Sequence, residues 1–104
     1  MRKLDGKIEG PFSIDEDLAM HGMITVSALV RSGVKFILHG MITGDLTVEP
    51  GARVIIHGAV NGVVINDGGR VEIFGIVDAV VDRSPQAVTV IDPAAQIKGQ
   101  QWAS

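Results

Sequence analysis

Large apolar side chains recur at every sixth position along most of this chain. The uninterrupted part of the series is Phe12, Leu18, Ile24, Val30, Phe36, Ile42, Val48, Val54 and Val60. After a one-residue deletion the count resumes at Ile65, Val71 and Val77, and after an irregularity near residues 82–85 it returns at Val88. Six residues advance an α-helix by about 240°, so a helix cannot use this period. Three short strands per turn can use it, and the pattern therefore predicts a parallel β-helix with three flat faces and coils of about 18 residues.

A second set of inward positions follows the first by two residues, as the alternation of side chains along a strand requires. Its members are mostly apolar or small, and they are Ile14, Met20, Val26, Leu38, Gly44, Ile56, Gly62 and Ile73. Small residues suit the tight corners between faces, which we expect at Gly22, Ala28, Gly40, Ala52 and Gly58. One phrase occurs twice within residues 44–76, first from Gly51 and again from Gly69, and this repeat supports the coil length.

The predicted fold class is all-β, a single-domain triangular solenoid of about five coils. We expect a lead-in over residues 1–11 with a possible short strand at residues 7–9, the solenoid over residues 12–98, and a loose tail over residues 99–104. Val88, Val90 and Ile97 are expected to lie on the last coil, and Val88 and Val90 to continue its inward positions.

Composition agrees with many short strands and argues against several functions. The 104 residues are 46% hydrophobic, chiefly valine and isoleucine, and they include 13 glycines. The net charge is -3 and the nine lysines and arginines are scattered, which argues against a nucleic-acid surface. The chain has no cysteine, so it forms no disulfide. No signal peptide and no apolar run of about 18 residues is visible, so we expect a cytoplasmic protein that contacts a membrane only peripherally, if at all.

Alignment of the coils places His21, His39 and His57 in one outward column, with Phe74 and Ile91 as its expected continuation. Imidazoles on adjacent coils could hold a metal ion or transfer protons. No carboxylate or fourth ligand is expected nearby, so we interpret the column as a stacked surface ladder. The sequence thus predicts no catalytic residue, no metal and no cofactor.

Apolar residues next to this column predict an interaction face made of Ile37, His39, Ile55, His57 and Phe74. A contiguous exposed apolar strip in a soluble protein more often marks a partner surface than an accident. The alternative is that a terminal segment, for instance the one that carries Trp102, folds over the strip.

The two ends of the solenoid are the other candidate contact site. An uncapped β-helix leaves backbone donors, acceptors and apolar core open at each end. No amphipathic capping helix can be read at either terminus, which favours self-association. The residues expected to make end-to-end contacts are Phe12, Ile14, Leu18, Val88 and Val90.

Several phrases in the chain resemble those of bactofilins, the bacterial polymer-forming cytoskeletal proteins. They are Lys7-Ile8-Glu9-Gly10, Asp15-Glu16-Asp17-Leu18, His21-Gly22, Gly44-Asp45-Leu46, Gly51-Ala52-Arg53-Val54 and Gly69-Arg70-Val71. The similarity covers residues 7 to 99. It implies a right-handed triangular β-helix that assembles end to end into nonpolar filaments without a nucleotide, often near the membrane, and that serves cell shape or the localisation of partners.

Three functions remain open at this point. The first is a scaffold that polymerises through its ends, with itself as the partner. The second is a small binding module, an adaptor or a toxin-neutralising protein, that docks another protein through the apolar face. The third is an enzyme of the hexapeptide acyltransferase or metal-dependent hydratase kind, against which stand the short chain and the lack of an insertion loop that could build a pocket.

Overall fold

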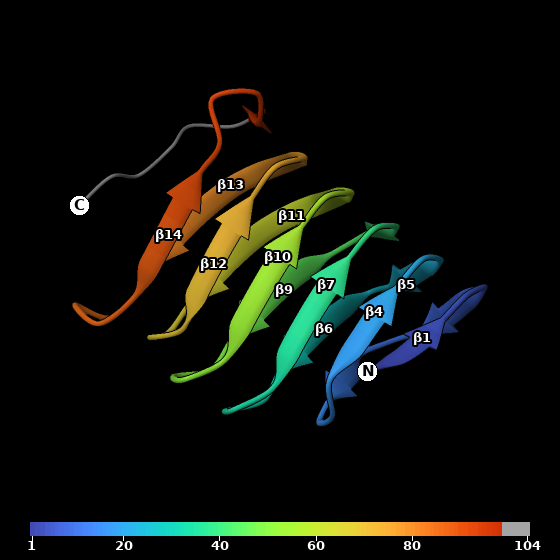
Figure 1. Ribbon diagram of the computed structural model, residues 1–104. Helices are drawn as coiled ribbons and strands as arrows, with labels where there is room; N and C mark the ends of the chain where they lie inside the picture. Colours follow the sequence, from blue (N-terminus) through green and yellow to red (C-terminus); the bar gives the residue numbers. More distant parts are fainter. Residues whose placement is uncertain (99–104) are drawn as a thin grey trace.

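The computed structural model describes residues 1–98 and shows a β-solenoid of about five turns (Figure 1). Every strand pair is parallel, and no helix occurs within residues 1–98. The predicted all-β parallel solenoid is therefore confirmed. It follows that no helix in this part of the chain is long and apolar enough to cross a membrane.

Each turn contributes strands to three faces. The first face consists of β1 (Arg2–Leu4), β4 (Leu18–Met20), β7 (Lys35–Leu38), β10 (Arg53–Ile56), β12 (Arg70–Ile73) and β14 (Val88–Ile91). The second begins with β2 (Lys7–Glu9), β5 (Met23–Thr25) and β8 (Met41–Ile42), and the third with β3 (Phe12–Ile14), β6 (Ser27–Val30) and β9 (Asp45–Val48). The longer strands β11 (Ala59–Asn66) and β13 (Ile76–Asp82) pass through both of these faces, and β15 (Gln96–Ile97) pairs with β13.

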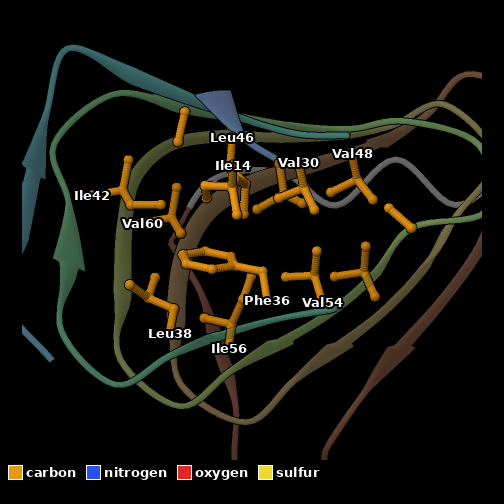
Figure 2. Packing of buried hydrophobic residues seen from close by; sticks show 14 of the residues in the cluster. Ile14, Val30, Phe36, Leu38, Ile42, Leu46, Val48, Val54, Ile56 and Val60 are labelled. Carbon is orange, nitrogen blue, oxygen red and sulfur yellow. The ribbon is translucent and has the colours of Figure 1, made fainter. Parts of the chain in front are cut away.

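The core consists of columns of apolar side chains, in which each residue stacks on the equivalent residue of the neighbouring coil. In the first face Leu18 pairs with Phe36, Phe36 with Val54, and Val54 with Val71. Phe36 and Val54 are fully buried, and the Phe36 ring lies among aliphatic side chains from all three faces (Figure 2). The inward positions that the six-residue period predicts from Leu18 to Val60 are all buried, because parallel pairing in register stacks equivalent residues.

The series is interrupted later than we expected. Ile65 is only half-buried, whereas Val64 and Asn66 are fully buried, because Val64 pairs with Leu46 and Asn66 with Val48. The six-residue count therefore continues to Asn66, and the deletion lies in the turn after it. Asn66 fits the interior because its side-chain oxygen accepts hydrogen bonds from the amides of Gly68 and Gly69, at 3.1 and 2.8 Å.

Two residues of the second coil also differ from their predicted orientation. Val26 was expected to point inward, but it sits at a corner with a φ of 74° and is 59% exposed. Gly44 stands above it, since a Cβ on Gly44 would meet the Val26 carbonyl oxygen. Ala28, predicted as a corner, is instead a buried strand residue that pairs with Leu46.

The start of the solenoid and the orientation of side chains in its last coil differ from the expected ones. Residues 1–11 contain strands β1 and β2 of the first coil, which pair with β4 and β5, so the coil begins at Arg2 and includes the expected lead-in. In β14, Thr89 pairs with Val71 and Ile91 with Ile73, so these two residues continue the inward columns. Val88 and Val90 point outward, which corrects their predicted inward orientation. The expected tail, residues 99–104 with Trp102, lies outside the described residues.

Candidate functional site

The corner between the first and second faces repeats one tripeptide pattern on successive coils. A large outward residue, a glycine and a second outward residue follow one another, as His21-Gly22-Met23, His39-Gly40-Met41, His57-Gly58-Ala59 and Phe74-Gly75-Ile76. We call these four tripeptides the corner strip. The first residue follows the last inward position of the first face. The third residue is the first of a strand in the second face, and the residue after it points inward.

The central glycines are required by the distance between coils. A Cβ on Gly58 would lie 1.8 Å from the carbonyl oxygen of Gly40, and a Cβ on Gly40 would lie 1.8 Å from that of Gly22. The backbone carbonyls here are engaged with the next coil, for instance from Ala59 N–H to Gly40 O at 3.0 Å. No side chain fits, so the middle of the corner strip stays bare along its whole length.

The first residues of the corner strip form a stacked ladder. Ring centroids lie 4.6 Å apart between His21 and His39, 5.2 Å between His39 and His57, and 5.2 Å between His57 and Phe74. The planes are inclined by 8°, 8° and 16°. The predicted surface ladder is thus confirmed, and its cause is the in-register pairing of β4, β7, β10 and β12.

The column that contains the ladder has an aspartate at each end. Phe74 N–H binds the carbonyl of Ile56, and Asp92 N–H binds that of Ile73 in the same way. Asp92 therefore continues the column, and the predicted continuation at Ile91 is wrong. At the other end His21 N–H binds the carbonyl of Leu4, so Asp5 precedes His21 in the column.

The environment of His39 disfavours its charged imidazolium form. Burial lowers the pKa of His39, and the neighbouring His21, His57 and Lys3 lower it further. Stacked rings aim their edges in the same direction rather than at a shared point. Within residues 1–98 no group of three His, Cys, Asp or Glu side chains is placed to hold a metal ion.

A shallow groove of about 770 Å³ runs along the bare glycines. Its floor is formed by Gly6, Gly22, Gly40, Gly58 and Gly75. Its sides include Lys7, Met23, Met41, His57, Ala59 and Ile76. Corners were expected at three of these glycines, but a groove was not. The signal that could have revealed the groove is the repeat of a glycine between two bulky residues.

The predicted interaction face is partly assembled by the fold. His39, His57 and Phe74 stack directly, and Phe74 is 41% exposed. Ile37 pairs with Ile55 in the adjacent outward column and both are half-buried. That column then continues with Glu72, which Ile55 meets in β12, so the apolar surface shifts toward the corner strip.

The predicted end contacts divide into two groups. Phe12, Ile14 and Leu18 line a cavity of about 260 Å³ at the amino-terminal end, together with Leu4. Val88 and Val90 do not belong to the opposite end of the core, since they are 45% and 43% exposed on the outside of β14. The apolar residues that reach the core from the last coil are Ile91, Ala95 and Ile97.

Comparison with known proteins adds no relative: no family model matches the chain, and neither a curated protein nor a solved structure does.

Proposed function

We propose that this protein is a non-enzymatic structural scaffold whose solenoids associate through their ends. The observation that carries the proposal is that the strands at the amino-terminal end have unpaired edges. There β1, β2 and β3 pair on one side only, with β4, β5 and β6, and the cavity that Leu4, Phe12, Ile14 and Leu18 line together with polar residues lies open between them.

In the part of the chain that the structure describes, the opposite end also has unpaired strand edges. Strand β14 pairs only with β12, and β15 only with β13. Ile91 and Ile97 are half-buried against the core. Unpaired strand edges and open apolar core are the features through which sheets add a further strand, so a second solenoid stacked on either end would satisfy both.

The resemblance to bactofilins supports the same proposal, because end-to-end assembly without a nucleotide is what it implies. On this proposal the partner is the chain itself, the location is the cytoplasm, and right-handed coiling and filaments are part of the expectation.

The size distribution of the purified protein against concentration tests the proposal. In sedimentation velocity, the wild type should form species larger than a dimer as the concentration rises through the micromolar range. Phe12→Lys and Ile91→Lys place a charge at the two open ends and should abolish these species. Val90→Lys is the matched control, because it lies next to Ile91 but points outward. A protein that forms no end-to-end species at any concentration or salt would exclude the proposal.

The second candidate function is a binding module that docks another protein. The groove along the corner strip, with Phe74 exposed beside it, favours this alternative. It predicts a discrete monomer or dimer, and loss of a defined partner on Phe74→Asp with the fold intact.

A further inference from the structure

We propose that two copies of this chain pair side by side, in parallel, with the outward column of Met23, Met41, Ala59 and Ile76 of each copy seated in the glycine groove of the other. This goes beyond end-to-end association and does not depend on it. The pair has a two-fold axis along the solenoid, so its interface is isologous.

The groove has a period that a second copy of the chain matches. Its lining repeats once per coil, and adjacent parallel strands lie about 4.8 Å apart. An extended peptide presents side chains of one face about every 6.8 Å, so it falls out of step with the groove within two coils. A second copy has the same period and stays in step from Gly22 to Gly75.

The shape of the corner strip also fits a second copy. Its bare floor lies beside the column of thioether and aliphatic side chains, and His57 of the ring column borders it on the other side. Rotation about the two-fold axis between the copies reverses the order of the two columns in the second copy. The Met column of each copy can therefore face the groove of the other. The Met41 sulfur then lies beside an imidazole column, a contact that thioethers make favourably.

Charge complementarity selects the parallel orientation. From the second to the fifth coil the corner strip bears no formal charge at pH 7, when the histidines are neutral. On the first coil, exposed Asp5 precedes the ring column and exposed Lys7 precedes the Met column. Parallel pairing brings Asp5 of each copy to Lys7 of the second copy, so that two attractive approaches stand against one approach of Lys7 to Lys7. Antiparallel pairing would bring Asp5 to Asp92 of the second copy in the ring column, where like charges repel.

Cross-linking tests this arrangement in a chain that has no cysteine of its own. Met41→Cys should give a covalent dimer with a short bismaleimide at low micromolar concentration. Thr43→Cys is the matched control, because Thr43 is exposed on the same face two residues on, outside the groove. Solenoids joined only by their ends keep the two copies of residue 41 apart, so end-to-end assembly alone leaves Met41→Cys unlinked.

A charge exchange tests the orientation. Asp5→Lys and Lys7→Asp should each weaken the side-by-side dimer roughly threefold to tenfold in sedimentation equilibrium, as two exposed ion pairs would. The double variant Asp5→Lys/Lys7→Asp should restore it. These measurements use Phe12→Lys/Ile91→Lys as background, so that contacts at neither end contribute and a remaining dimer is the lateral one.

Each outcome decides the inference. A Met41→Cys dimer with no Thr43→Cys dimer, and rescue by the double variant, supports it. Absence of the Met41→Cys dimer overturns it and leaves the groove to a different protein. A dimer that the single charge variants do not weaken, or that the double variant does not restore, overturns the parallel orientation. Absence of end-to-end species from the wild type, with the lateral dimer present, would reject only the proposed function.

Discussion

His39 and His57 are 18 residues apart in sequence, and their imidazole rings stack with centroids 5.2 Å apart and planes inclined by 8°. The stack is a consequence of backbone pairing, because Leu38 and Ile56 face one another in β7 and β10 and the next residues follow in step. The distance between the rings is therefore set by the spacing of the coils and not by the attraction between the side chains.

We expect the stability of the protein to fall as the pH is lowered through the histidine range. Because the folded state lowers the pKa of His39 below its ordinary value of 6.5, the unfolded chain binds more protons between these two pKa values. The contribution of neutral His39 to the stability is therefore complete above about pH 6.5 and is lost as the pH falls toward the pKa of His39 in the folded state. Urea unfolding at pH 7.5 and 5.5 measures the effect. His39→Phe keeps a flat ring without a charge and should reduce the pH dependence; an unchanged pH dependence would contradict the assignment to the ladder.

A methyl group on Gly58 should be far more damaging than one on Gly33. The added Cβ on Gly58 would lie 1.8 Å from the Gly40 carbonyl oxygen, so two coils would have to separate. We expect Gly58→Ala to lower the free energy of unfolding by about 3 kcal/mol or more. Gly33→Ala meets no atom within 4 Å and carries only the strain of its φ of 77°, about 1 to 2 kcal/mol. Chemical denaturation compares the two, and equal losses would show that the coil contact is not the cause.

Replacing Asn66 with valine should destabilise the protein even though the position lies in an aliphatic column. The Asn66 side-chain nitrogen donates to Val88 O and to Thr89 Oγ1, both at 3.2 Å, and its oxygen holds two turn amides. Asn66→Val leaves these groups without their partners, at a cost of about 2 to 4 kcal/mol in total. Exposed Asn61→Val is the control and should change the free energy of unfolding by less than about 0.5 kcal/mol. A neutral Asn66→Val would mean that water replaces the lost bonds.

Truncation of Phe36 tests the assignment of inward and outward positions. Phe36 is fully buried and Ile37, next to it, is half-buried on the outside. Phe36→Ala should lower the free energy of unfolding by about 3 to 5 kcal/mol. Ile37→Ala should cost about 1 kcal/mol, since most of its surface change occurs at the exterior. Similar losses from the two variants would argue against the alternation along β7.

Several features of the fold could be predicted from the sequence alone because they depend on local rules. Alternation along a strand and a constant coil length place Leu18, Phe36 and Val54 inside and His39 outside, whatever the rest of the chain does. The ladder of His21, His39 and His57 follows from their spacing for the same reason. The predictions failed where the coil length changes: near Ile65 and Val88 a shift of one residue reverses which side chains point inward, and only pairing with the previous coil decides the register.

The corner strip illustrates the division most clearly. The sequence determined that glycines recur at Gly40 and Gly58 and that bulky residues flank them, since these identities are local. Only the tertiary structure decided that the glycines form the floor of one continuous groove, because the contact that excludes a side chain comes from the neighbouring coil. It also decided that the amino-terminal end opens a cavity beside Phe12 while β14 turns Val90 outward, because the orientation of an end residue is set by the strand on which it is stacked.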